Sequence, residues 1–209
     1  MAAKPSQATV HVIDDDASLR AALEDLLDSV ALASRTYKTA SEFLNANIAD
    51  ALGCLIVDVR LPDMNGLEFQ TQLTKRGFRL PVIMITGHGD IPMSVRAMKE
   101  GAVDFLPKPF RDQDLLDAVL AAIERDRQRR TNEGDFDQVK QRFGTLSARE
   151  RQVMLMVTSG KMNKQVAGEL GISEITVKIH RGSAMRKMKA STFADLVRMA
   201  DAVRPKAQQ

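Results

Sequence analysis

The sequence predicts an α/β domain, a doubly wound parallel sheet of the (βα)5 type, followed by an all-α domain of four helices that contains a helix-turn-helix. Two observations predict this fold class. Short apolar runs alternate with helical patterns over the first 125 residues, whereas the rest of the chain has helical periodicity throughout. The charge also changes sign, from 18 Asp and Glu against 13 Lys and Arg up to Arg125 to 9 against 17 beyond it. The second domain is therefore expected to bind an anionic partner.

Five short apolar runs are the predicted strands of the first domain. Leucines at helical spacing between the first two runs predict a helix, 66–75 and 91–100 predict two more, and a last helix starts near Asp112. Strands that alternate with helices in this way imply a parallel sheet covered on both faces. The predicted strands are Thr9–Ile13, Ala33–Tyr37, Cys54–Val57, Pro81–Ile85 and Val103–Leu106.

A charged stretch separates the two predicted domains. The run from Glu124 to Arg130 continues the last helical pattern and is charged on all sides. It predicts a solvated linker or a coiled-coil extension, which we expect Gly134 and Asp135 to interrupt. We therefore expect a first domain over 8–124, a helical linker over 125–142 and a second domain over 143–205.

Helix signals divide the second domain. Ser147 and Glu150 have the spacing of a capping box at the start of its first helix. A short helix over 163–170, a turn at Gly171 and a longer helix capped by Ser173 form a helix-turn-helix pattern, and a fourth helix follows over about 192–203.

Polar side chains follow four of the five predicted strands. Asp14 and Asp15 follow the first, Asp58 the third, Thr86 the fourth and Lys108 the fifth. The carboxyl ends of parallel strands lie at one edge of the sheet, where such folds bind ligands. Crowded carboxylates favour a hard divalent cation such as Mg²⁺, and Asp58 would be a nucleophile toward a phosphoryl donor. Alternatively, Asp14–Asp16 cap the first helix, Asp58 is a turn residue and Lys108 is an exposed loop lysine.

Residues 8–125 resemble two-component receiver domains. The resemblance implies that Asp58 accepts a phosphoryl group and that Mg²⁺ (or Mn²⁺) binds Asp15 and Asp58, with Asp14 acting mainly through a water molecule. The segments that carry the resemblance are Val12–Asp16, Leu55–Asp58, Leu61–Gly66, Ile85–Gly87 and Leu106–Phe110.

Four further roles follow from the same resemblance. The backbone carbonyl of Arg60 supplies another metal ligand, and Lys108 contacts the phosphoryl group. Thr86 and Phe105 are the switch pair, and many receivers have tyrosine where this chain has Phe105, which has no hydroxyl to donate.

The third helix of the second domain has the pattern of a DNA-recognition helix. Val177, Ala184, Met185 and Met188 share one face, and Lys178, Ile179, Gly182 and Arg186 lie away from it. Lys178 could donate to guanine and Ile179 could contact a thymine methyl group. Phosphate candidates are Lys164, His180, Arg181 and Lys187. Alternatively, this is an ordinary amphipathic helix with a basic, solvated face.

Residues 145–203 resemble LuxR-type DNA-binding domains, and the end of the chain is similar to the FixJ subgroup. The resemblance adds Asn163 and Thr176 to the DNA-binding candidates, while Gly182 departs from relatives that have a base-contacting lysine there. The matching residues are Leu146–Glu150, Gly160, Asn163–Lys164, Val166–Ala167, Leu170, Ile172–Ser173, Thr176–Lys178, His180, Lys187–Ala190 and Asp195–Ala200.

Together the two resemblances imply a response regulator of the FixJ/NarL class. It would accept phosphate from a sensor histidine kinase on Asp58, form a homodimer, bind double-stranded promoter DNA and act with RNA polymerase. It would not be an enzyme, apart from phosphorylation and dephosphorylation of its own Asp58. The absence of a membrane-length apolar run or secretory signal, together with the single Cys54, favours the cytoplasm and no membrane partner.

Two rival functions remain open from the sequence. One is a dimeric DNA-binding protein that ignores phosphorylation. The other is a phosphatase of the haloacid-dehalogenase type with Asp14 as nucleophile and Asp16 as the second acid, although Ser18 stands where such enzymes usually have threonine or valine.

Overall fold

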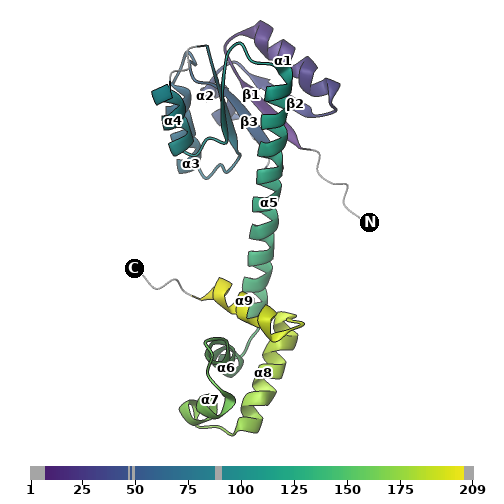
Figure 1. Cartoon of the computed structure of the whole chain (residues 1–209), viewed down its shortest axis with the longest axis vertical. Helices are drawn as coiled ribbons and strands as arrows, with labels where there is room; N and C mark the ends of the chain where they lie inside the picture. Colours follow the sequence, from purple (N-terminus) through teal and green to yellow (C-terminus); the bar gives the residue numbers. More distant parts are fainter. Residues whose placement is uncertain (1–7, 47, 49, 88–90, 205–209) are drawn as a thin grey trace. The chain divides into compact units, whose positions relative to one another are not determined.

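The computed structural model describes residues 8–46, 48, 50–87 and 91–204 (Figure 1). The chain divides into two compact units, one ending at Arg130 and the other beginning at Thr131. This division falls within one helix of the chain. No helix in this described part of the chain combines the length and hydropathy that a bilayer-spanning segment requires.

The first unit contains a five-stranded sheet in which every adjacent pair is parallel, in the order β2-β1-β3-β4-β5. The predicted parallel sheet is confirmed. Because the strand order reverses between β1 and β3, the carboxyl ends of these two strands flank the crevice where open sheets bind ligands. The strands are β1 (Thr9–Ile13), β2 (Ala33–Tyr37), β3 (Gly53–Asp58), β4 (Val82–Thr86) and β5 (Asp104–Pro107).

Helices connect these strands. The predicted helix over 66–75 is confirmed at both ends, whereas α2 was not predicted because six residues are too few to show a helical period. The Thr39 hydroxyl caps α2 by accepting from the Glu42 N–H. The helices are α1 (Ala17–Ser29), α2 (Ala40–Asn45), α3 (Gly66–Lys75), α4 (Ile91–Lys99) and α5 (Asp112–Gly144).

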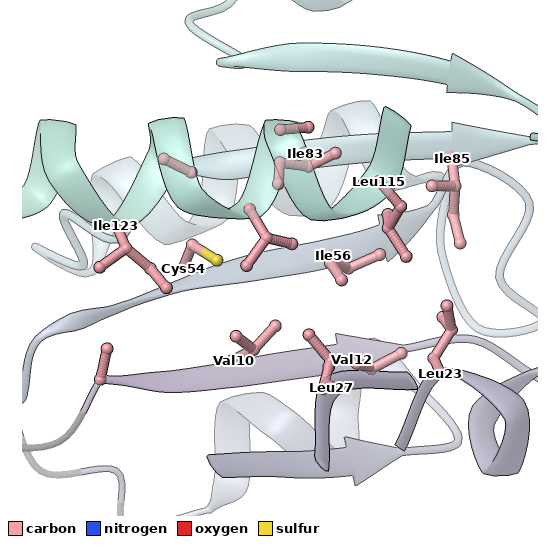
Figure 2. Close-up of a cluster of buried hydrophobic side chains, with 14 of the residues drawn as sticks. Val10, Val12, Leu23, Leu27, Cys54, Ile56, Ile83, Ile85, Leu115 and Ile123 are labelled. Carbon is pink, nitrogen blue, oxygen red and sulfur yellow. The ribbon is translucent and has the colours of Figure 1, made fainter. Parts of the chain in front are cut away.

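Each face of the sheet has its own apolar core, because successive strand residues point to opposite faces. On one face, strand residues pack against Leu23 and Leu27 of α1 and Leu115 and Ile123 of α5 (Figure 2). The strand side chains drawn there are Val10, Val12, Cys54, Ile56, Ile83 and Ile85. On the other face, Val57 and Met84 pack against Phe43, Phe69 and Ala97 of α2, α3 and α4. Apolar residues on both faces explain why the strands have nearly continuous hydrophobic runs.

The expected break at Gly134 and Asp135 is wrong, because α5 continues to Gly144. A glycine inside a helix costs only about 1 kcal/mol relative to alanine. Packing of Val139 and Phe143 against the core of the second unit can offset that cost. The expectation that the charged run is all solvated is also wrong at Asp126, which is fully buried.

The second unit comprises the last turns of α5 and four further helices: α6 (Ala148–Thr158), α7 (Asn163–Leu170), α8 (Glu174–Met188) and α9 (Phe193–Val203). The predicted capping box between Ser147 and Glu150 is confirmed. Gly171 has a φ of +64° in the turn between α7 and α8, a conformation that glycine adopts without strain. Ser173 caps α8. The predicted four-helix domain with its helix-turn-helix is therefore confirmed.

Two small clusters form the core of this second unit. Met154, Met188 and Leu196 belong to one, and Val166 and Val177 belong to the other. Because α8 contributes to both clusters, one of its faces is held against the domain, and its opposite face is left to solvent.

Candidate functional site

A lysine shared by two buried carboxylates marks the first candidate site, at the carboxyl edge of the sheet. Lys108 follows β5, Asp14 follows β1 and Asp58 ends β3. The Lys108 Nζ lies 2.7 Å from Asp14 Oδ2 and 2.5 Å from Asp58 Oδ2. Asp14 is fully buried and Asp58 is 7% exposed. The convergence of these three side chains is therefore confirmed.

Backbone groups orient the two carboxylates. The second oxygen of Asp58, Oδ1, accepts from the Arg60 N–H at 2.9 Å, and Oδ1 of Asp14 accepts from the Asp16 N–H at 2.9 Å. Each carboxylate therefore has one oxygen held by the amide two residues later and the other directed at Lys108. Such fixed geometry lowers the cost of arranging the site for a reaction.

Hydrogen bonds between the oppositely charged groups of the site oppose the cost of burying their charges. Burial raises the pKa of the Asp14 carboxyl, and the hydrogen bond from Lys108 only partly opposes that rise. For Lys108, burial lowers the pKa, but the hydrogen bonds to Asp14 and Asp58 outweigh it, so the net pKa is raised. The lysine is consequently held in its cationic form.

Three carboxylates of the site suit a divalent metal ion. Asp14, Asp15 and Asp58 each offer an oxygen, and these oxygens lie within 4.8 Å of one another. One ammonium group cannot balance three carboxylates, and all-oxygen ligands are those that Mg²⁺ and Mn²⁺ prefer. The donor set therefore fits such an ion. The N–H of Arg60 is bound to Asp58, and the predicted role of the Arg60 carbonyl as a metal ligand stays a prediction.

The capping explanation applies to one of the acidic residues only. Asp16 caps α1, because its Oδ1 accepts from the N–H groups of Ser18 and Leu19. Asp14 instead faces Lys108 and the Asp16 amide, and Asp15 is exposed beside them. Asp14 and Asp16 therefore have different roles despite their proximity in sequence.

Gly66 is a site residue that the sequence reasoning did not single out. It begins α3, and a Cβ atom at this position would lie 2.8 Å from the Asp58 carbonyl oxygen and 2.9 Å from the Val59 Cα. Only glycine allows the helix to approach the end of β3 this closely. The Asn65-Gly66 pair was a visible signal, since Asn65 caps α3 by accepting from the Leu67 N–H.

The predicted switch residues lie on adjacent strands. Thr86 ends β4 and is fully buried, and it pairs in register with Pro107 of β5. By alternation Thr86 shares the sheet face of Met84, and Phe105 packs half-buried against the core on that same face. The structure therefore puts both side chains on one side of the sheet, and their joint motion stays a prediction.

The second candidate site is the outer face of α8. Val177, Ala184 and Met188 are buried, whereas Lys178, Ile179, Gly182 and Arg186 are exposed. The predicted division of the helix into an apolar and a solvent face is confirmed. His180 and Thr176 are half-buried at its margins, and the Thr176 hydroxyl pairs with the Ser173 hydroxyl at 2.8 Å.

A basic hollow of about 610 Å³ lies between the start of α7 and α8. It brings together four of the predicted DNA-binding residues, Asn163, Lys164, Lys178 and Arg181. Lys161 also lines it, although its ammonium is paired with Glu169 at 2.6 Å. A concave surface with several cations suits phosphate groups.

Lys187 is differently placed from the other DNA-binding candidates. Its Nζ lies 2.6 Å from Glu150 Oε2, in the capping box of α6. The hydrogen bond from Lys187, followed by that from the Ser147 N–H, lowers the pKa of Glu150. A phosphate contact by Lys187 would therefore compete with an ion pair inside the domain.

Two family models match the chain. The response regulator receiver domain matches residues 10–120, and the luxR family of bacterial regulatory proteins matches residues 144–200. These two matches cover the two candidate sites separately.

Several known proteins are similar over most of the chain. Nodulation protein W of Bradyrhizobium diazoefficiens is 54% identical over 94% of this chain and 86% of its own length. The transcriptional regulatory protein FixJ of Azorhizobium caulinodans is 44% identical over 94% and 93% of the two chains. Among solved structures, the response regulator StyR is 46% identical, covers 94% of this chain and 99% of its own, and superposes with a TM-score of 0.81.

Proposed function

Because this chain belongs to the response regulators that join a receiver domain to a LuxR-type DNA-binding domain, we propose that phosphorylation of Asp58 controls its affinity for promoter DNA. The family regulates transcription and is not a class of enzymes with a separate substrate. A receiver domain implies a sensor kinase as partner, and the LuxR-type domain implies DNA. The single observation that carries the proposal is the shared contact of Lys108 with Asp14 and Asp58.

The proposed domain limits are a receiver over 8–124, a connector over 125–142 and a DNA-binding domain over 143–205. The matched ranges of the two family models lie inside the two proposed domains. The connector is proposed as the part of α5 between them.

The proposed reaction is transfer of one phosphoryl group from a phosphohistidine of the sensor histidine kinase. The P–N bond breaks, a P–O bond forms to a carboxylate oxygen of Asp58, and the histidine nitrogen leaves. Lys108, already 2.5 Å from Asp58 Oδ2, would follow the new charge and contact a phosphoryl oxygen. A bound Mg²⁺ or Mn²⁺, held by Asp15 and Asp58, with Asp14 through a water molecule and the Arg60 carbonyl, would neutralise charge on the transferring group. Self-dephosphorylation would be attack of water on the phosphorus of this acyl phosphate, which breaks the P–O bond, releases inorganic phosphate and regenerates the Asp58 carboxylate.

Burial favours Asp58 over Asp14 as the acceptor. Asp14 is 0% exposed and Asp58 is 7% exposed, so a donor reaches Asp58 more readily. The rival phosphatase mechanism also needs a free second acid two residues after its nucleophile, but Asp16 is used to cap α1. Both observations favour the response-regulator chemistry.

The proposed output is a population shift between two receiver states. The phosphoryl group adds nearly two negative charges, Thr86 moves toward them, and Phe105 moves into the space beside Thr86. A shift from 1:99 to 99:1 requires about 5.5 kcal/mol of differential stabilisation. The active receivers would pair, and the homodimer would bind two half-sites and act with RNA polymerase. We further propose that the protein works in the cytoplasm, where promoter DNA is accessible.

The proposed DNA contacts use the residues around α7 and α8. Lys178 and Ile179 would contact base edges, and the others would contact the backbone. Lys187 stays a phosphate candidate whose ammonium must first leave Glu150. The backbone set is Asn163, Lys164, Thr176, His180, Arg181 and Lys187.

The deciding experiment is phosphorylation by acetyl phosphate with Mg²⁺, followed by intact mass and DNA affinity. Wild type should gain about 80 Da, the mass of one phosphoryl group, and bind its operator more tightly. Asp58→Asn should do neither, and the exposed control Asp25→Asn should behave as wild type. A mass gain by Asp58→Asn would refute the acceptor assignment. Equal operator affinity with and without phosphorylation would support the phosphorylation-independent rival.

A further inference from the structure

Two large apolar side chains stand exposed on the outer face of α8. Ile175 is 70% exposed and Ile179 is 62% exposed. Residues four apart lie on the same side of a helix, so the two side chains form one apolar patch. Single exposed apolar residues are ordinary on protein surfaces, but a pair on the face expected to enter a groove calls for an explanation.

The fold does not require this pair. The inner face of α8 is already filled by Val177, Ala184 and Met188, each of which is fully buried. The start of the helix is stabilised by Ser173, whose hydroxyl accepts from the Thr176 N–H. Polar residues at positions 175 and 179 would therefore be compatible with the same helix and the same core.

The surroundings of the pair indicate a polyanionic partner. Lys178 lies between the two isoleucines in sequence, Arg186 continues the same face, and both are exposed. Lys178 also lines the basic hollow with Lys164 and Arg181. Within the major groove, the apolar group on a base edge is the C5-methyl of thymine. A cationic face with an apolar patch is thus complementary to thymine-containing duplex DNA.

We propose that Ile175 and Ile179 form a pair that recognises thymine methyl groups at two positions about two base pairs apart. Four residues of a helix rise about 6 Å, and base pairs in a duplex are about 3.4 Å apart. Both isoleucines lie in the first two turns of α8, the part of a recognition helix that contacts base edges. Gly182 contributes no side chain in the following turn, so recognition is concentrated at the start of the helix. The inference deepens the DNA-binding part of the proposed function and does not depend on the switch in the receiver.

The test uses the full chain, treated with acetyl phosphate and Mg²⁺, and a library of randomised duplexes. Sites enriched by wild type are resynthesised with deoxyuridine replacing one thymine at a time, which removes only the methyl group. Affinity should fall about three- to tenfold at two positions about two base pairs apart within each half-site. Ile175→Ala should abolish the thymine-to-uracil difference at one of them, and Ile179→Ala at the other.

Met162→Ala is the matched control. Met162 is 67% exposed, precedes α7 and lines the basic hollow, so the change removes apolar surface beside the phosphate candidates but none from α8. This variant should keep both thymine-to-uracil differences. Since all three side chains are exposed, the variants should retain the wild-type melting temperature, which verifies that each one folds.

The outcomes separate this inference from the proposed function. Enriched duplexes whose affinity ignores the thymine methyl groups would overturn the inference alone. The same conclusion follows if Ile175→Ala and Ile179→Ala weaken all duplexes equally and keep the uracil penalty, since the pair would then contact the DNA backbone or a protein. Failure to enrich any duplex would overturn the proposed function together with the inference.

Discussion

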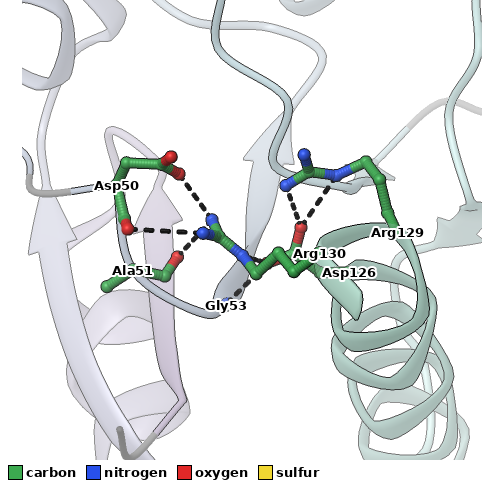
Figure 3. A network of polar contacts seen from close by, with 6 residues as sticks. All are labelled: Asp50, Ala51, Gly53, Asp126, Arg129 and Arg130. Atoms are coloured by element: carbon green, nitrogen blue, oxygen red, sulfur yellow. Dashed lines mark hydrogen bonds and ion pairs between the residues drawn. The ribbon is translucent and has the colours of Figure 1, made fainter. Parts of the chain in front are cut away.

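Arg130 donates from its Nε to the buried carboxylate of Asp126, 2.8 Å away and one turn earlier on α5. The same guanidinium donates to Asp50 Oδ1 at 2.6 Å and to the Ala51 carbonyl at 2.8 Å, and Asp126 also accepts from the Gly53 N–H (Figure 3). These contacts tie α5 to the start of β3. The charged run from Glu124 to Arg130 looks like a solvated linker in the sequence. Two of its residues, Asp126 and Arg130, are nevertheless packed into the first unit.

Asp126→Ala should destabilise the first unit by about 3–5 kcal/mol, because it leaves Arg129, Arg130 and the Gly53 N–H without their buried acceptor. Urea unfolding of the full chain measures this as an earlier transition of the receiver. Asp50→Ala is the control, since the Asp50 side chain is 90% exposed and its ion pair should contribute less than about 1 kcal/mol. If the two changes lowered the free energy of unfolding equally, burial of Asp126 would not be what makes its ion pairs stabilising.

Gly66→Ala should slow phosphorylation and destabilise the receiver by about 1–3 kcal/mol, because the new methyl group would lie 2.8 Å from the Asp58 carbonyl oxygen. The backbone must shift, and the Asp58 carboxylate would shift with it. The rate of mass gain with acetyl phosphate measures the effect. Gly168→Ala in α7 meets nothing within 4 Å and should leave phosphorylation unchanged. A wild-type rate for Gly66→Ala would show that this close approach does not position Asp58.

His11 should make the receiver less stable as the pH falls. Its Nδ1 lies 3.1 Å from the Tyr37 hydroxyl, and burial, with a smaller effect of Arg35, lowers its pKa from 6.5 to about 4. As the pH falls, His11 is therefore protonated at a higher pH in the unfolded chain than in the folded chain. The stability contributed by neutral His11 is complete above about pH 6.5 and is lost between there and about pH 4, amounting to about 2 kcal/mol after allowance for solvent screening.

The measurement is the urea midpoint of wild type and His11→Gln between pH 7.5 and 4.5. The difference between the two proteins isolates His11, because the raised pKa of Asp14 affects both and acts in the opposite direction. Wild type should lose more stability than His11→Gln on acidification. Parallel pH profiles would show that His11 does not titrate in this range.

Lys164 and Lys187 should differ in the salt dependence of DNA binding. Lys164 lines the basic hollow, so Lys164→Ala should reduce the slope of log affinity against log salt by about 0.9, the value for one phosphate contact. Lys187→Ala should reduce it less, because its ammonium is paired with Glu150 at 2.6 Å. Titrations of a fixed duplex at several salt concentrations measure both slopes. A larger change for Lys187 would show that it leaves Glu150 on binding DNA.

Much of the fold could be predicted because its signals are local. The limits of α3 and α7, the Ser147–Glu150 capping box and the two faces of α8 follow from residues within a few positions of one another. Helix α2 and the uninterrupted α5 could not be predicted in the same way. Helix α2 is too short to show a helical period. In α5, packing against the core of the second unit can offset the cost of Gly134, and no local pattern shows that packing.

By itself the sequence determined most of the elements, except α2 and the full length of α5, and the chemical groups that end the strands. Propensity, capping and alternation depend on neighbouring residues, which the sequence shows directly. Only the tertiary structure decided which of these groups meet. In the folded chain Lys108 pairs with two carboxylates, buried Asp126 accepts from the Gly53 N–H, and the Lys187 ammonium pairs with Glu150. The physical reason is that burial and ion pairing depend on residues 37 to 94 positions apart, which no local pattern encodes.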